Sequence, residues 1–123
     1  MMNALLEKEE LTQQFQALSA GTYALSGAPA SSGSQHAMER RGLTLNSHRS
    51  QAVTGMLLDM CDLIVGITPT HVLQLRMMYP QCATPMVALE DPPVSDPYGL
   101  ADAAYEQAAC DIQRQLPALL SML

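Results

Sequence analysis

Apolar residues at helical spacing mark both ends of the chain. Near the N-terminus they share one side with Glu and Gln opposite, which predicts a helix from about residue 1 to residue 16: Met2, Leu5, Leu6, Phe15 and Leu18. A second helix is predicted to start near Leu100, with a core-facing stripe of residues four or three apart: Tyr105, Ala109, Ile112, Leu116, Leu119 and Leu123. Pro117 is expected to kink this last helix.

The middle of the chain alternates between short apolar runs and helix signals. Residues 63–67 are apolar without a polar side, which predicts a strand buried on both faces, as in a parallel sheet. Thr68 and Pro69 are typical of an N-cap and a first helical position, and the helix they open is predicted to end near Met78. Residues 86–89 form a second predicted strand. Strands alternating with helices indicate an α/β layer fold with a parallel sheet.

Three further segments carry weaker signals. Residues 17–20 are a short candidate strand, and residues 26–33 are expected to form a loop rich in Pro, Gly and Ser. Ser34 is the predicted N-cap of a short helix that runs through Arg41, with Gly42 at its C-terminal end. Another helix is predicted over residues 51–60. No internal repeat is present, and residues 1–123 are expected to form one domain.

Composition narrows the class of protein. The chain has 123 residues and 48% hydrophobic residues, which suffices for one packed core and argues against wholesale disorder. Six basic and twelve acidic side chains give a formal net charge of −6. Nucleic-acid affinity comes largely from Lys and Arg neutralising phosphates, so no nucleic-acid partner is expected. Arg40, Arg41 and Arg49 form only a modest basic patch.

Cysteine usage and hydropathy indicate a compartment. Cys61, Cys82 and Cys110 are odd in number, far apart and without a C-x-x-C pair, so we expect reduced thiols and no disulfide framework. No apolar run approaches the roughly 20 residues of a membrane span, and the acidic N-terminal residues are unlike a signal peptide. We therefore expect a soluble, cytoplasmic domain without a membrane partner.

Two residues are candidates for acid–base chemistry. Asp96 lies in the sequence Asp-Pro-Tyr-Gly after a predicted strand, where ligands of α/β sheets bind, which makes it a candidate general acid. The residues alone favour a plain turn there, because Asp, Pro and Gly are turn formers. For His71, near the start of a predicted helix, a half-buried hydrogen-bonded role is favoured over a catalytic one.

Nucleophilic and metal chemistry find little support in the sequence. No cysteine has a neighbourhood that would activate it: Cys61 and Cys110 each lie beside an Asp, and no His, Arg or Gly-rich segment surrounds Cys82. The three histidines show no metal-ligand spacing and no cysteine pair supports them. We therefore expect no metal site.

The order of motifs along the chain is more informative than any one of them. In order they are Met2-Asn3-Ala4-Leu5-Leu6, Leu18-Ser19-Ala20-Gly21-Thr22, Gly42 with Ser47-His48-Arg49, Asp62-Leu63-Ile64-Val65 with Thr68-Pro69-Thr70-His71, Asp96-Pro97-Tyr98-Gly99, and Tyr105-Glu106. Over essentially all 123 residues the chain resembles the low-molecular-weight protein tyrosine phosphatase family, including its bacterial arginine-phosphatase branch.

The resemblance implies a fold, a mechanism and roles for individual residues. The fold would be a three-layer α/β/α arrangement with a small parallel sheet of strand order 2-1-3-4. In the family a cysteine thiolate attacks phosphorus, and an arginine and backbone amides hold the phosphate. By resemblance Asp96 is the general acid and Tyr98 lines the substrate cleft, while Ser19 and His71 brace the phosphate loop. The substrates would be phosphotyrosine or phosphoarginine side chains of proteins, and no cofactor would be needed.

One departure from the family pattern is severe. The family's nucleophile and arginine lie in a C-x₅-R-S loop after the first strand, but the residues six after the three cysteines are Ile67, Ala88 and Leu116. By resemblance, this chain therefore lacks the first strand, the loop and the nucleophile, and is expected to be inactive as it stands. Either the true start lies upstream, which we favour, or the chain is a truncated pseudo-phosphatase that binds phosphoproteins or other partners without cleavage.

Overall fold

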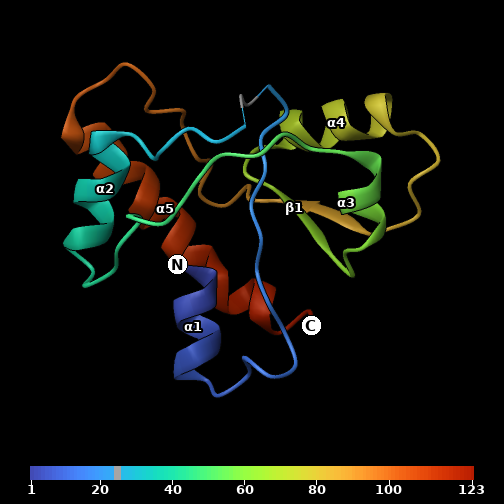
Figure 1. Cartoon of the computed structure of the whole chain (residues 1–123), viewed down its shortest axis with the longest axis horizontal. Helices are drawn as coiled ribbons and strands as arrows, with labels where there is room; N and C mark the ends of the chain where they lie inside the picture. Colours follow the sequence, from blue (N-terminus) through green and yellow to red (C-terminus); the bar gives the residue numbers. More distant parts are fainter. Residues whose placement is uncertain (24–25) are drawn as a thin grey trace.

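The computed structural model covers the whole chain and describes residues 1–23 and 26–123 (Figure 1). In chain order the elements are α1 Met2–Lys8, α2 Ser32–Glu39, α3 Gly55–Asp59, β1 Ile64–Gly66, α4 Pro69–Met78, β2 Met86–Ala88 and α5 Asp102–Leu120. No helix within the described ranges is long and apolar enough to cross a membrane.

The two strands pair in parallel, as predicted. Ile64 is in register with Met86 and Gly66 with Ala88. The ladder is anchored by the Ile64 N–H, which donates to the Pro85 carbonyl, and by the Leu89 N–H, which donates to Gly66. The predicted apolar run thus contains a strand, although only its three central residues pair. The remaining strands of the family order stay a prediction.

Helices cover both faces of this small sheet. On one face Ile64 and Met86 pack in a cluster with Leu58 of α3 and Leu75 of α4. On the other face Val65 and Val87 pack against a second buried cluster, which comes from the loop after β2 and from α5: Leu89, Val94, Ala108, Leu116 and Leu119. Partly buried side chains of α1 also pack against this cluster. In Figure 1 the short helices α1 and α2 lie near α5, while α3 and α4 lie beside the sheet. The expected α/β layering is confirmed.

The start of α4 follows local chemistry. The Thr68 hydroxyl accepts from the His71 N–H, which is the capping arrangement expected of Thr followed by Pro. The helix ends at Met78, before Tyr79 and Pro80, as predicted. Pro fits the first turn because the N–H it lacks would have no helical partner there.

Helix α5 follows most of the predicted stripe. Ala109, Leu116 and Leu119 are buried. Leu123 was expected on this stripe, but the expectation is wrong: the helix ends at Leu120, and Leu123 is 46% exposed. Pro117 lies inside the last turns of the helix, which continues past it.

The first helix is half as long as expected. It ends at Lys8 rather than near residue 16, because Glu10 adopts a left-handed φ of 59°. The Leu11 N–H donates to the Leu6 carbonyl and the Glu10 N–H donates to the Glu7 carbonyl, which is the Schellman pattern that closes helices. Glycine usually occupies that left-handed position, so the sequence carried no stop signal. Leu18, expected on this helix, is 57% exposed outside it.

Residues 17–20 do not form the expected strand. Their neighbourhood contains one isolated bridge, from Gly21 to Ala52. The segment is held instead by the Asn3 side chain, which bonds both the N–H and the carbonyl of Ala17 at 2.8 and 2.9 Å. A strand needs a continuous ladder, and within the described residues no strand pairs with this segment.

Two helix starts also differ from expectation. Ser31, not Ser34, caps α2, so the helix begins inside the segment expected to be a loop. Thr54 caps α3, which begins at Gly55 rather than near residue 51. Ser and Thr recur around both starts, and only tertiary packing selects among them. Gly42 does close the end of the α2 segment, with a φ of +71°.

Candidate active site

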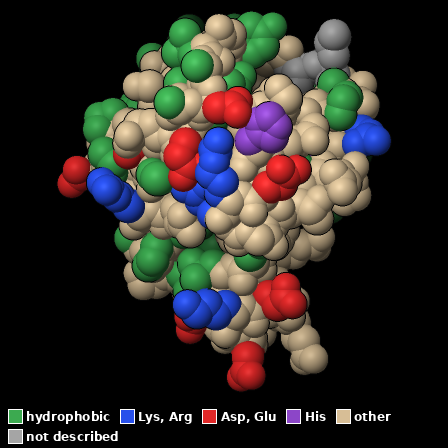
Figure 2. Space-filling view, turned by 90° about the vertical axis from the view of Figure 1, so that its left-hand side faces the viewer, with side chains coloured by type: hydrophobic (Ala, Val, Ile, Leu, Met, Phe, Trp, Pro, Cys, Tyr) green, Lys and Arg blue, Asp and Glu red, His purple; other side chains and the backbone are tan. Residues whose placement is uncertain are grey.

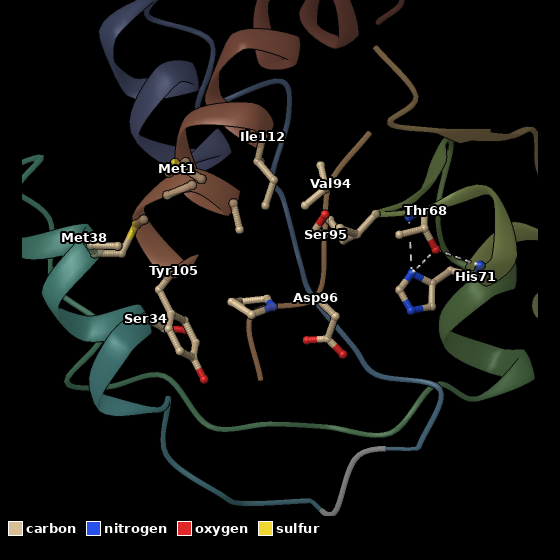
Figure 3. A pocket seen from close by; sticks show the side chains of 15 residues that line it. Met1, Ser34, Met38, Thr68, His71, Val94, Ser95, Asp96, Tyr105 and Ile112 are labelled. Atoms are coloured by element: carbon tan, nitrogen blue, oxygen red, sulfur yellow. Dashed lines mark hydrogen bonds between the residues drawn. The ribbon is translucent and has the colours of Figure 1, made fainter. Parts of the chain in front are cut away.

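A cavity of about 490 Å³ lies beyond the carboxyl end of β1. One wall comes from α2 and α5, and the other from the β1–α4 turn and the loop of residues 94–97 (Figure 3). Most of the lining is apolar; the polar side chains around it are Ser34, Thr68, His71, Ser95, Asp96 and Tyr105. In open α/β sheets ligands bind at the carboxyl ends of strands, so this is the candidate site.

Asp96 lines this cavity from an exposed loop. Its Oδ1 accepts from the Tyr98 N–H at 3.0 Å, an Asx turn that fixes the carboxylate. Its Oδ2 has no hydrogen-bond or ion-pair partner in the described part of the chain. The turn and the acid–base interpretations of Asp96 are therefore compatible, since one oxygen holds the loop while the other remains available to a ligand.

His71 is fixed in one tautomer by the N-cap of α4. Its Nδ1 accepts from the Thr68 N–H at 3.3 Å and lies 3.1 Å from the Thr68 hydroxyl. A nitrogen that accepts a backbone N–H carries no proton, so the proton of the neutral ring resides on Nε2. The expected half-buried, hydrogen-bonded histidine is what the structure contains. Because His71 also lines the cavity, its Nε2–H is a donor for whatever the cavity holds.

The other two predicted site residues do not line the cavity. Tyr98 is 85% exposed and is not among the residues that line the cavity, although it directly follows the Asp96 loop. Ser19 is exposed, and its backbone carbonyl accepts from the Gln51 amide at 2.8 Å. Their predicted roles in the cleft and in bracing a phosphate loop stay predictions.

Four polar lining residues were not singled out as site residues, and one of them, Thr68, was expected only as the N-cap of α4. Ser34 comes from α2, Ser95 precedes the acid, and Tyr105 was expected only as part of the core-facing stripe. Figure 3 shows Ser34 and Tyr105 on the wall opposite Asp96 and His71. The helical stripe predicted that Tyr105 faces inward, but a periodicity cannot distinguish a filled interior from a cavity.

An ion-pair cluster joins the two helices of that wall. Arg41 donates to Glu106 at 2.8 and 3.0 Å, and also to Gln113, Cys110 and the Ala37 carbonyl. Arg40 lies 3.1 Å from Glu106, and His36 lies 2.7 Å from Asp102. Figure 2 shows basic, acidic and histidine side chains gathered on the face that includes α2.

The same cluster shifts the acidity of its members. The hydrogen bonds from Arg41 lower the pKa of Glu106 to about 2, since they favour the charged carboxylate. Glu106 in turn raises the pKa of Arg41 above its already high ordinary value. Glu106 therefore stays charged, and available to pair with Arg41, at any pH above the acidic range.

No thiol of the described chain lines the cavity. Cys61 donates to the Leu57 carbonyl, Cys82 lines a smaller separate cavity of about 280 Å³, and Cys110 contacts Arg41. Within the described residues no group of His, Cys, Asp and Glu is arranged to hold a metal ion. The available chemistry of the cavity is thus one carboxylate, one imidazole and several hydroxyls.

Comparison with known proteins decides the family. Residues 1–123 match the family described as low molecular weight phosphotyrosine protein phosphatase. A probable low molecular weight protein-tyrosine-phosphatase of Ralstonia solanacearum, EpsP, is 32% identical over 104 residues, which is 82% of this chain and 72% of the relative. The chain belongs to the low molecular weight protein tyrosine phosphatase family. The resemblance inferred from the order of motifs is confirmed.

Solved structures of phosphatases share the family fold of this chain. A low molecular weight protein tyrosine phosphatase from T. tengcongensis is 26% identical with a TM-score of 0.86, and the match covers 99% of this chain and 86% of that one. The arginine phosphatase YwlE, in a form with a phosphorylated active-site serine, is 23% identical with a TM-score of 0.89, covering 99% and 82%. The match leaves out part of each solved chain.

Proposed function

We propose that this chain supplies the general acid and one side of the substrate cleft of a protein phosphatase. Asp96 protonates the leaving oxygen or nitrogen as the bond to phosphorus breaks, and then accepts a proton from the water that attacks the phosphoenzyme. The single observation that carries this role is the Asp96 carboxylate beside the cavity, which one oxygen holds in place while the other has no partner among the described residues. The Nε2–H of His71 would donate to the phosphate loop or to the phosphate itself.

The nucleophile and the phosphate-binding arginine would have to come from outside residues 1–123. The sequence holds no C-x₅-R, and the three thiols are engaged or lie elsewhere. We therefore propose that the chain alone does not turn over phosphate esters. On its own it would act, at most, as a module that binds a phosphorylated side chain or a partner.

Phosphotyrosine is the proposed substrate class, with phosphoarginine as the alternative by the same mechanism. The 32% identical relative is named a tyrosine phosphatase, and the arginine phosphatases are more distant in sequence. The exposed ring of Tyr98, next to Asp96, is suited to contact a planar substrate side chain.

Three free cysteines favour a reducing compartment such as the cytoplasm.

The test adds a nucleophilic cysteine and a phosphate-binding arginine to the chain. A strand followed by a Cys-x₅-Arg-Ser loop is fused upstream of Met1, and hydrolysis of p-nitrophenyl phosphate is measured. We expect turnover by the fusion, none by the unfused chain, and none when the added cysteine is replaced by serine. Asp96→Asn in the fusion should lower kcat while leaving the cysteinyl-phosphate able to form. Turnover by the unfused chain that Asp96→Asn leaves unchanged would refute the proposal.

A further inference from the structure

The smaller cavity lies at the other end of the sheet from the candidate active site. It has a volume of about 280 Å³ and is lined by residues of α3 and of the connection from α4 to β2: Gly55, Asp59, Tyr79, Pro80, Gln81 and Cys82. Both segments lead into strands, so this cavity is near the amino ends of β1 and β2. In Figure 1 α3 and the connection lie on the side away from α2. Small-molecule sites begin at roughly 300 Å³, so this cavity is of a size for a single side chain.

Contacts with the core fix the walls of this cavity. The Tyr79 hydroxyl donates to the Val53 carbonyl at 3.3 Å. The side chains of Tyr79 and Cys82 pack against the buried cluster between the sheet, α3 and α4. The Thr84 hydroxyl joins the two lining segments, because it donates to the Leu58 carbonyl at 3.1 Å. The cavity is therefore formed before a ligand arrives, which lowers the ordering cost of binding.

Asp59 brings a negative charge to the cavity without a partner for it. Its carboxylate has no hydrogen bond or ion pair within residues 1–23 and 26–123. Asp59 is also the last residue of α3, where the helix dipole disfavours a negative charge. Among the described residues no Lys or Arg lines the cavity, and Arg76 of α4 is not within ion-pair distance of Asp59. The carboxylate thus stabilises nothing in the fold and remains available to a cation.

The ring of Tyr79 gives the cavity a second group that suits a cation. An ideal Cβ built on Gly55 would lie 3.5 Å from Cδ1 and from Cε1 of this ring, so glycine leaves that part of the ring uncovered. A guanidinium group is planar, accepts a carboxylate through two of its N–H groups and stacks on aromatic rings. The pairing of Asp59 with Tyr79 therefore favours arginine over lysine.

The surface next to the cavity is apolar and acidic. Three exposed methionines are sequence neighbours of lining residues, with 76%, 72% and 48% of their surfaces exposed: Met56, Met60 and Met78. Methionine side chains are flexible and are common on surfaces that bind peptides. Asp62 is exposed close to Met60 in sequence, and the net charge of the whole chain is −6. A complementary partner is positively charged and carries apolar residues beside its charge.

We infer that this cavity is a docking site for an arginine side chain of a partner protein, presented on an exposed segment with an apolar residue on each side of the arginine. The guanidinium bonds the Asp59 carboxylate and stacks on Tyr79, and the flanking apolar side chains contact the exposed methionines. Because Asp96 is at the other end of the sheet, this partner and a phosphorylated side chain can be bound together. The docking does not depend on the proposed phosphatase reaction.

The test measures binding of a short peptide to the full chain by isothermal titration calorimetry. The probe is Ser-Leu-Arg-Leu-Ser with both ends blocked, so that the arginine carries its only charge. We expect Asp59→Asn to bind the probe about tenfold more weakly than the wild type does, which corresponds to about 1.4 kcal/mol. A loss of this size is typical of a hydrogen bond to a charged group.

Two further variants and a second peptide serve as controls. Asp62→Asn removes an exposed acid outside the lining and should change the affinity by less than about twofold. Gly55→Ala places a methyl group at ordinary contact distance from Tyr79, so it should keep the fold and still weaken binding of the probe. Thermal unfolding of each variant checks that the fold is kept. A peptide with citrulline, a neutral isostere of arginine, should bind the wild type and Asp59→Asn equally weakly.

Three outcomes would overturn the inference. If Asp59→Asn and Asp62→Asn weaken binding equally, the acidity of the whole chain attracts the probe, and the cavity does not. If the citrulline peptide binds the wild type as tightly as the arginine peptide, the site does not recognise a cation. If the probe does not bind the wild type at millimolar concentration, the cavity is not a docking site for arginine.

Discussion

Gly33 lies where α2 meets the ring of Tyr105, and its replacement by alanine should be destabilising. An ideal Cβ at Gly33 would lie 2.6 Å from Cγ and 2.7 Å from Cε2 of Tyr105, inside any normal contact distance. Because the clash involves the base of the ring, Tyr105 cannot yield by moving a flexible tip. The ring would have to rotate into the cavity it lines, or α2 would have to move away from α5.

The magnitude follows from two opposing effects. Overpacking of this kind costs about 1–3 kcal/mol. Alanine recovers up to about 1 kcal/mol over glycine through its helix propensity. The middle of these two ranges gives a fall of about 1.5 kcal/mol in the free energy of unfolding for Gly33→Ala. At roughly 4 °C per kcal/mol for a chain of this size, circular dichroism at 222 nm should show a clear fall in Tm.

In the decisive control, Gly33→Ala should have the opposite effect on the free energy of unfolding. In a Tyr105→Ala background the clash is gone, so Gly33→Ala should stabilise the protein by up to about 1 kcal/mol. Urea unfolding of the four proteins, wild type, both single variants and the double variant, gives this coupling directly. Equal destabilisation by Gly33→Ala in both backgrounds would show that the ring contact is not the cause.

Three further predictions concern the helix start, the ion-pair cluster and the acid. Thr68→Ala should cost about 1 kcal/mol in urea unfolding and Thr68→Ser much less, because serine keeps the cap. The pKa of Glu106, lowered from 4.5 to about 2, means that its stabilisation is complete above pH 4.5 and is lost as pH falls toward 2. Urea midpoints across that window should fall less steeply for Glu106→Gln than for wild type; parallel curves would contradict the assignment. In the fusion with a restored loop, Asp96→Ala should lower kcat by roughly 10²–10⁴, and an unchanged pH–rate profile would rule out its acid role.

Local chemistry accounts for the parts of the fold that the sequence predicted well. The Thr68 side chain accepts from an N–H of the first turn of α4, and Pro69 has no N–H that would need a partner there. The start of α4 is therefore determined by residues that are adjacent in sequence. The run at residues 63–67 is apolar on both sides, and both faces of β1 are indeed covered. Asp96 was found through its position after a strand, and the structure has it beside the cavity.

The predictions from sequence were wrong or incomplete where an unusual backbone conformation or a contact between distant segments determines the structure. Glu10 adopts a left-handed conformation that glycine usually adopts, so the sequence did not predict the early end of α1. Residues 17–20 have strand-like composition but lack a neighbouring strand to pair with. Tyr105 faces inward as its spacing requires, yet only the packing of α2 against α5 determines that it borders a cavity. Such facts depend on segments far apart in the chain.

The cluster between α2 and α5 also has a consequence for how the chain folds. Arg41 and Glu106 are 65 residues apart in sequence, so the contact closes a loop that contains the whole sheet. Contacts of such long range form late, since the entropy of closing the loop must be overcome first. During synthesis from the N-terminus, α2 has no partner for Arg41 until α5 has been made. The wall that carries Ser34 and Tyr105 is therefore expected to assemble last, after β1, α4 and β2 have formed around their own local cluster.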